Sequence, residues 1–144
     1  MPAVAQGFLP DSISTDLHTG SMNGAMIDMP TTMSKFLAMG APLREVIRRS
    51  TWRPAQIIRH EEAGHLSVGA EADIAAFRIE DGDFAFADSD LGRYSGRRRL
   101  RCELTLRAGK VVWDWNARGS VDYRTLGPAY GVRPGEAITP PAKD

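Results

Sequence analysis

Cysteine and histidine are scarce in this sequence, which contains one cysteine, Cys102, and three histidines, His18, His60 and His65, among 144 residues. A single cysteine excludes an intramolecular disulfide and a zinc site built from cysteines, and it suits a reducing compartment. Long apolar runs are also lacking, and residues 1–7 have neither the basic start nor the apolar core of a signal peptide. We therefore expect a cytoplasmic protein with no membrane partner.

An excess of charge of either sign is absent too, because 18 Lys and Arg residues balance 18 Asp and Glu residues. A neutral chain has no overall electrostatic bias toward nucleic acid. One local basic cluster is a candidate for binding an acidic partner or nucleic acid, and it consists of Arg93, Arg97, Arg98, Arg99, Arg101 and Arg107. The overall neutrality favours the alternative, that these arginines form the solvated face of a β-hairpin. We expect no nucleic-acid partner.

Residues 28–40 are predicted to form a helix. Asp28 can cap its start, Pro30 falls in the first turn where its missing donor is harmless, and Gly40 can supply a left-handed stop. The apolar residues recur at helical spacing, which predicts one buried face. That face consists of Met29, Met33, Phe36 and Leu37.

Two shorter helices are predicted to follow. The first begins at Pro42, with Leu43, Val46 and Ile47 toward a core and with Arg44, Glu45, Arg48 and Arg49 pointing away. Thr51 can cap the second, which tolerates Pro54 at its third position because a backbone donor would still be free there. Ile57 and Ile58 are then expected to face inward.

After Gly64 the hydrophobic period changes from helical to alternating, which marks a domain boundary. Strands are predicted over residues 72–79, 82–86 and 99–107. In the last of these, Leu100, Cys102, Leu104 and Leu106 share one face, and Arg101, Glu103, Thr105 and Arg107 share the other. A tight turn at residues 108–109 then leads into a strand over 110–114, so we expect a hairpin. From residue 116 onward Gly and Pro are frequent, which predicts a draped or partly disordered tail.

Asp16 is the candidate catalytic residue. It ends a short β-prone piece at residues 13–15 and precedes a loop rich in Gly, Ser and Asn. A carboxylate just past the carboxyl end of a strand is where α/β barrels place catalytic groups, because the strand fixes the backbone while the side chain reaches the barrel mouth. Asp16 could instead only cap the turn after the strand, and the residues alone leave both interpretations open.

An ordered set of segments runs from residue 10 to residue 73. The set begins with Pro-Asp-Ser-Ile-Ser-Thr-Asp-Leu-His at residues 10–18, Ser-Met-Asn-Gly at 21–24 and Met-Ser-Lys-Phe-Leu at 33–37. It continues with Pro-Leu-Arg-Glu-Val-Ile at 42–47, Thr-Trp-Arg-Pro-Ala at 51–55 and Gly-His-Leu-Ser-Val-Gly-Ala-Glu-Ala-Asp at 64–73. Together these segments resemble the end of the barrel in dihydroorotase-like amidohydrolases and deacetylases, a branch of the metal-dependent amidohydrolase superfamily. The resemblance covers about residues 7–115.

The resemblance implies an α/β chain that holds the last strand and helices of a (β/α)8 barrel, followed by the C-terminal strands of a small β-sandwich. Residues 1–63 would be the end of the barrel, 64–115 the β-sandwich portion and 116–144 a Gly- and Pro-rich tail. The implied activity is metal-dependent hydrolysis of a non-peptide C–N bond in an N-acyl or cyclic amide, with an ester as substrate of a related deacetylase. The implied cofactor is a divalent metal, first of all zinc. Of the family's metal ligands, only the aspartate after the last barrel strand corresponds to a residue of this sequence, Asp16. In the family this aspartate also carries a proton from the attacking water to the leaving amine.

Most of the family's metal site is missing from this sequence. None of the histidines forms a His-x-His pair, and a catalytic zinc usually needs about three protein ligands. His18, two residues after Asp16, is a weaker candidate for lining the site. The run from His60 to His65 is not a His-Glu-x-x-His zinc helix, because its histidines are five residues apart and fall on different helix faces.

We therefore expect the isolated chain to be inactive and to bind no metal tightly. Its expected partners are a missing N-terminal barrel portion and, in the complete enzyme, a small-molecule amide or ester, with a homo-oligomer left open. The alternative is a non-catalytic, β-rich interaction module or a truncated remnant.

Overall fold

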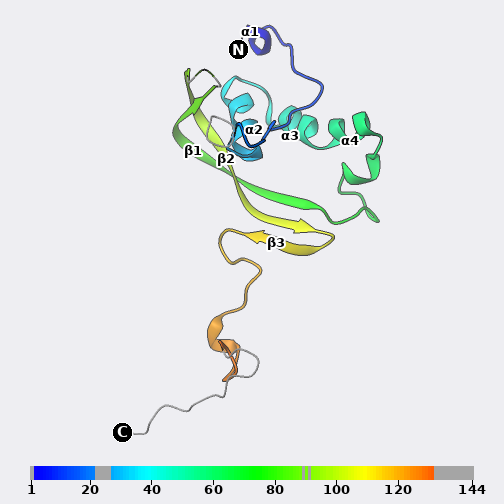
Figure 1. Ribbon diagram of the computed structural model, residues 1–144, viewed down its shortest axis with the longest axis vertical. Helices are drawn as coiled ribbons and strands as arrows, with labels where there is room; N and C mark the ends of the chain where they lie inside the picture. Colours follow the sequence, from blue (N-terminus) through cyan, green and yellow to red (C-terminus); the bar gives the residue numbers. More distant parts are fainter. Residues whose placement is uncertain (1, 22–26, 89, 91, 132–144) are drawn as a thin grey trace.

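The computed structural model describes residues 2–21, 27–88, 90 and 92–131, in which helices pack against a small antiparallel sheet (Figure 1). The α-helices are α1 (Pro2–Ala5), α2 (Met29–Ala38), α3 (Leu43–Ser50) and α4 (Trp52–Ile58). The strands are β1 (Ile74–Ala87), β2 (Arg93–Arg107) and β3 (Lys110–Asp114), in the order β1-β2-β3. Two 3-10 turns, η1 (Glu61–Ala63) and η2 (Tyr123–Thr125), complete the described elements. The predicted mixture of helices and antiparallel strands is confirmed.

Helix α2 forms as its sequence predicts. Asp28 Oδ1 accepts a hydrogen bond from the Thr31 N–H at 2.7 Å, which satisfies one of the free donors at the helix start. Gly40 has a φ of +95° and ends the helix in the left-handed conformation that glycine adopts without strain. Met33 and Leu37 are buried, and the other two residues of the predicted apolar face are half-buried. The face that periodicity identifies is therefore the face that packs on the sheet.

Helices α3 and α4 also lie where they were predicted, but two details differ. Thr51 makes no side-chain cap for α4, because its hydroxyl donates instead to the Ile47 carbonyl of α3 at 3.0 Å. The prediction that Ile57 and Ile58 face inward is wrong, since they are 57% and 64% exposed. Among the described residues, α4 buries only Ala55. It packs against α3 and η1, and no other described element covers the side of α4 that faces away from them.

The strands form a longer sheet than the sequence patterns indicate. The two predicted strands over 72–79 and 82–86 are one strand, β1, with an irregular register between Asp81 and Phe84. Pairing with β2 holds β1 together across this point, and β2 itself starts at Arg93, six residues before the predicted start. The predicted hairpin between β2 and β3 is confirmed. Its turn has positive φ at Ala108 (47°) and Gly109 (74°), the backbone of the two-residue turns that suit the twist of a hairpin.

One small core joins the helices to the sheet. It consists of Ile13, Met33, Leu37, Ala41, Val46 and Leu100, the last of these from β2. Ser34 of α2 is fully buried, and its hydroxyl oxygen accepts from the Leu100 N–H at 2.8 Å while it donates to the Pro30 carbonyl at 2.6 Å. A buried polar group with both partners costs little, so this serine links helix and strand without an unsatisfied donor.

The predicted strand at residues 13–15 does not form. A parallel strand needs neighbouring strands on both edges, and the described part of the chain offers none beside it. Ile13 is nevertheless 4% exposed, and its N–H donates to the Arg49 carbonyl of α3 at 2.8 Å. The segment is therefore held against a helix.

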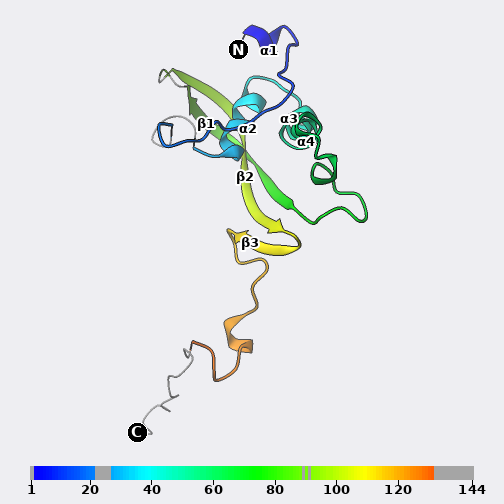
Figure 2. The same cartoon turned by 45° about the vertical axis from the view of Figure 1, so that its right-hand side comes forward.

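The described residues after β3 extend away from the sheet, as two views show (Figures 1 and 2). Residues 116–131 are exposed along their whole length, and residues 132–144, the rest of the predicted tail, lie outside the described residues. Among the residues that the structure describes, no helix is both long enough and apolar enough to cross a membrane.

Candidate active site

Asp16 lies in a loop whose backbone is tightly organised. Its φ of 51° is in the left-handed region, which aspartate tolerates better than most residues. The Ser21 hydroxyl lies 3.1 Å from the Asp16 carbonyl and accepts from the His18 N–H at 3.0 Å. The Leu17 N–H donates to Thr15 Oγ1 at 3.2 Å. These bonds hold the backbone of Asp16 and its neighbours in place. The backbone in turn fixes the position from which the Asp16 side chain projects.

The Asp16 carboxylate is exposed, and no described residue gives it a hydrogen bond or an ion pair. Within the described residues there is also no group of three or more His, Cys, Asp and Glu side chains that could hold a metal ion. Zinc in enzymes usually takes about three protein ligands. Asp16 therefore offers a single metal ligand, and the described side chains do not by themselves form a site for a catalytic metal.

The histidines serve local structure. His18 Nδ1 accepts from the Gly20 N–H at 3.1 Å, so this ring nitrogen is used within the Asp16 loop. His60 Nδ1 lies 2.8 Å from Glu62 Oε1, and His65 packs at 6.0 Å from the Trp52 ring centroid. The turn between His60 and His65 is the short 3-10 turn η1, which agrees with the rejection of a zinc helix.

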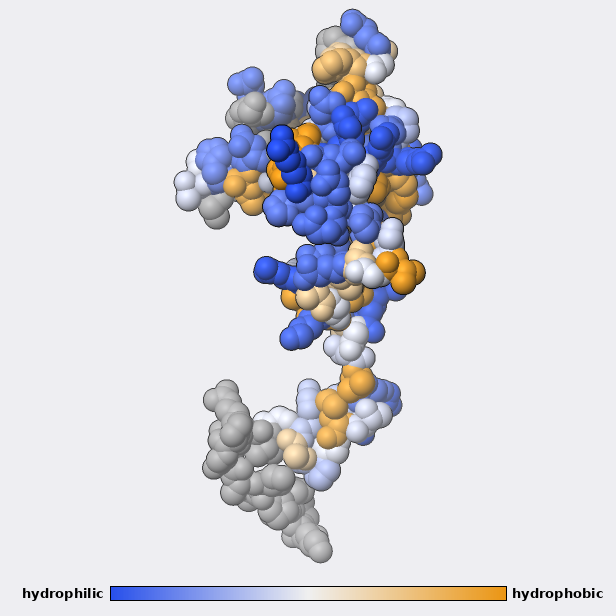
Figure 3. Space-filling model, turned by 90° about the vertical axis from the view of Figure 1, so that its right-hand side faces the viewer, coloured by the Kyte–Doolittle hydropathy of each residue, from blue (hydrophilic) through white to orange (hydrophobic). Residues whose placement is uncertain are grey.

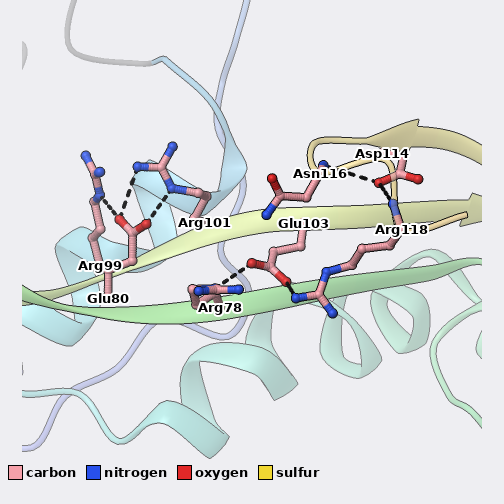
Figure 4. Close-up of polar contacts among 8 residues, drawn as sticks. All are labelled: Arg78, Glu80, Arg99, Arg101, Glu103, Asp114, Asn116 and Arg118. Carbon is pink, nitrogen blue, oxygen red and sulfur yellow. Dashed lines mark hydrogen bonds and ion pairs between the residues drawn. The ribbon is translucent and has the colours of Figure 1, made fainter. Parts of the chain in front are cut away.

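Three of the six arginines in the cluster on β2 pair with acidic side chains, and Figure 4 shows two of them, Arg99 and Arg101. Glu80 of β1 accepts from Arg99 Nε and from Arg101 Nε, each at 2.6 Å. Arg97 pairs with Asp83. The register of β1 against β2 places these opposite charges on neighbouring strands, which is the arrangement that stabilises a sheet. This pairing supports the solvated hairpin face over a nucleic-acid site.

A second acidic centre ties the segment after β3 to the sheet. Glu103 is buried at 7% exposure and pairs with Arg78 at 2.5 Å and with Arg118 at 2.7 Å. Beside it, the Asp114 carboxylate accepts from the backbone N–H groups of Gly119 and Arg118, which lower its pKa. Figure 4 shows the bond from Arg118. The contacts are internal, so we assign this cluster a structural role.

The Glu80 cluster predicts an acid-dependent loss of stability. Hydrogen bonds from Arg101 and Arg99 lower the pKa of Glu80 from 4.5 to about 2. Because the folded-state pKa is depressed, the stabilisation is complete above the unfolded pKa of 4.5 and is lost as the pH falls toward 2. The difference in Tm between the native chain and Glu80→Gln should therefore be constant above about pH 5 and should shrink below it.

Thermal unfolding followed by circular dichroism between about pH 6 and pH 2.5 measures this difference. Glu71→Gln is the control, because Glu71 is exposed and has no ion pair in the described structure. If Glu80→Gln and Glu71→Gln follow the same pH profile, the Glu80 pairs do not stabilise the fold.

Several apolar side chains remain uncovered, in separate surface patches around a hydrophilic area (Figure 3). They include Ile57, Ile58 and Leu66, the last of which is 74% exposed. A cleft of about 440 Å³ lies between the helices and β1, and its apolar lining includes Met29, Met33, Ile47, Leu66, Ile74 and Phe77. Exposed apolar surface of this kind usually marks an interaction site.

No protein-family model matches this chain. The chain is similar to three curated proteins that are each named as a deacetylase. One from Agrobacterium fabrum is 44% identical over 98 residues, which is 68% of this chain and 24% of the relative. One from Brucella anthropi is 44% identical over 88 residues, 61% of this chain and 22% of the relative. One from Enterococcus faecalis is 29% identical over 110 residues, 76% of this chain and 30% of the relative.

Two solved structures are similar in fold as well as in sequence. A dihydroorotase superimposes with a TM-score of 0.72 and 35% identity, over 78% of this chain and 31% of its own. An adenine deaminase superimposes with a TM-score of 0.72 and 29% identity, over 78% of this chain and 30% of its own. The chain therefore spans about a quarter to a third of the length of the proteins it matches.

Proposed function

Because the chain belongs to the amidohydrolase superfamily, whose C-terminal portion it matches, we propose that it is the C-terminal part of a metal-dependent hydrolase of non-peptide C–N bonds. The substrate would be a small N-acyl or cyclic amide, or an ester in the manner of a related deacetylase. The names of the relatives support this class, since several are deacetylases and a structural neighbour is a dihydroorotase. A cytoplasmic location stays a prediction that rests on the single cysteine.

The proposed division of the chain follows the change from helices to strands at Gly64. Residues 1–63 would close a (β/α)8 barrel, 64–115 would belong to a small β-sandwich and 116–144 would be a tail. Two features support a missing remainder. Ile57 and Ile58 are exposed on α4, and β1 and β3 are the edges of the described sheet. A barrel portion packed beside them would bury this apolar surface and pair or cover the strand edges.

Asp16 would supply the proton transfers. Its carboxylate is exposed and is unengaged within the described residues, so it is free to act on a substrate. In the proposed reaction, Asp16 takes a proton from the attacking water and returns it to the leaving amine, because an amide nitrogen leaves poorly unless it is protonated. A divalent metal, for which zinc is the first expectation, would be held by Asp16 together with ligands from outside this chain, and it would supply activation of the attacking water.

The chain alone is proposed to be inactive, because it brings one carboxylate to a site that needs about three protein ligands. A chimera tests the proposal: this chain replaces the matching quarter of the Agrobacterium fabrum deacetylase. We expect the chimera to hydrolyse N-acetyl amino acids, cyclic amides or acetyl esters, and a chelator to abolish the activity. The chain alone and the remaining part of the deacetylase alone should both be inactive.

The parent deacetylase, assayed on the same substrates, is the positive control. A chimera that folds and binds zinc but hydrolyses none of these substrates would contradict the proposal. That result would favour the non-catalytic module.

A further inference from the structure

The segment that leads to Asp16 is attached to helix α3 through Arg49. The Arg49 carbonyl accepts the Ile13 N–H at 2.8 Å, and the Arg49 guanidinium donates through Nη1 to the Pro10 carbonyl. Backbone and side chain of one arginine thus hold two points of the same segment. The sequence pattern placed Arg49 on the solvent face of the helix, and this is wrong, because its side chain is 20% exposed.

The Arg49 guanidinium also forms an ion pair within its own helix. Its Nε lies 3.3 Å from Glu45 Oε2, one helical turn earlier, although this nitrogen makes no hydrogen bond in the described structure. The directed contact is the one from Nη1, because a guanidinium presents its donors in a rigid fork. Nη1 donates to the Pro10 carbonyl, which no strand neighbour occupies among the described residues.

On the other side of Asp16, the Ser21 hydroxyl contacts the Asp16 carbonyl at 3.1 Å. Asp16 therefore sits between two held points, with a φ of 51°. A non-glycine residue in this region is strained, and it persists where the surrounding structure holds it. These contacts on both sides restrict the backbone from which the Asp16 carboxylate projects.

We propose that Arg49 is a positioning residue for Asp16, acting through the Pro10 and Ile13 backbone. The inference rests on the proposed catalytic role of Asp16 and adds a residue on a different element to that site. Arg48 provides a matched comparison. It lies on the same helix, pairs only weakly with Glu45 at 3.8 Å, and has no described contact with residues 9–16.

Amide hydrogen exchange in the full chain tests the attachment itself. Arg49→Met keeps the apolar stem and removes the charge and the donors. We expect exchange at the Ile13 N–H to become at least about tenfold faster in Arg49→Met and to stay unchanged in Arg48→Met. Arg49→Lys keeps the charge but loses the fork, and it should give an intermediate rate. It also preserves the test if the methionine variant does not fold.

The Val46 N–H, which donates within α3 to the Pro42 carbonyl at 3.0 Å, reports on the helix. It should keep its protection in every variant. Unchanged Ile13 exchange in both Arg49 variants would overturn the proposal. Equal acceleration at Val46 and Ile13 would overturn it as well, because Arg49 would then stabilise the helix in general.

The active chimera tests whether the attachment serves Asp16. We expect Arg49→Met to lower kcat by at least about tenfold with KM within about twofold, since positioning of a proton carrier acts in the transition state. In an Asp16→Asn background, Arg49→Met should not lower kcat any further, because the effects of two residues that act as one unit are not additive. A full additional loss in that background, or a loss in KM alone, would refute a role through Asp16. An inactive parent chimera would refute the proposed function, while the Ile13 exchange would still decide the attachment.

Discussion

Asp16→Asn is expected to lower the kcat of the active chimera by about 10² to 10⁴, the range for lost general acid–base catalysis. Asparagine keeps the size of the side chain and one oxygen, but it cannot take up the proton. It also tolerates the left-handed conformation at this position, so the loop should keep its shape. The loss should lie in kcat more than in KM, because proton transfer matters in the transition state.

Steady-state kinetics with a parallel measurement of bound zinc checks this prediction. Asp83→Asn is the control, because Asp83 is an exposed aspartate of β1 that pairs with Arg97 and does not belong to the segment around Asp16. It should leave kcat within about threefold of the parent, as expected for a residue outside the chemistry. An Asp16→Asn chimera with zinc bound and more than about a tenth of the parental kcat would show that Asp16 is a turn residue.

Met33→Ala is expected to destabilise the chain by about 2–5 kcal/mol, which is the usual cost of emptying a buried methionine site. Met33 is 2% exposed and lies in the core cluster with Val46 and Leu100. This small core connects α2, α3 and β2, so a cavity there weakens each of these contacts. Because small domains are marginally stable, we expect a large part of the total stability to be lost.

Urea unfolding followed by fluorescence and circular dichroism measures the change. Met39→Ala is the control, since Met39 is a half-buried methionine at the end of the same helix. Met39→Ala should lower the free energy of unfolding by less than half as much as Met33→Ala. Equal effects at the two positions would mean that the cluster around Met33 is not the core that holds the chain together.

The helices and the β2–β3 hairpin could be predicted because their signals are local. Asp28, Pro30 and Gly40 delimit α2 within the helix itself, and the turn at residues 108–109 determines the hairpin from two positions. Residues 13–15 differ, because a parallel strand exists only with strand neighbours on its edges. The segment is β-prone, but nothing in the described chain pairs with it, so the predicted strand is absent.

Of the residues proposed for the site, only Asp16 could be predicted from the sequence. Arg49 was missed because helical periodicity places it among charged residues on a solvent face, and no local pattern indicates that a distant carbonyl lies within its reach. The same is true of Glu80, whose arginine partners are 19 and 21 residues away and are selected by strand register.

The amino-acid sequence by itself therefore determined the helix limits, the hairpin turn and the family that residues 7–115 resemble. Each of these depends on residues a few positions apart, whose geometry follows from backbone and side-chain preferences. The predicted alternation of faces along β2 fails at Glu103, where the register with β1 is irregular and this carboxylate is buried. The tertiary structure alone decided that α3 holds the Asp16 segment, that Glu80 and Glu103 gather the arginines, and that Ile57 and Ile58 stay exposed. These features depend on contacts between elements far apart in the chain, and such contacts exist only once the elements have packed.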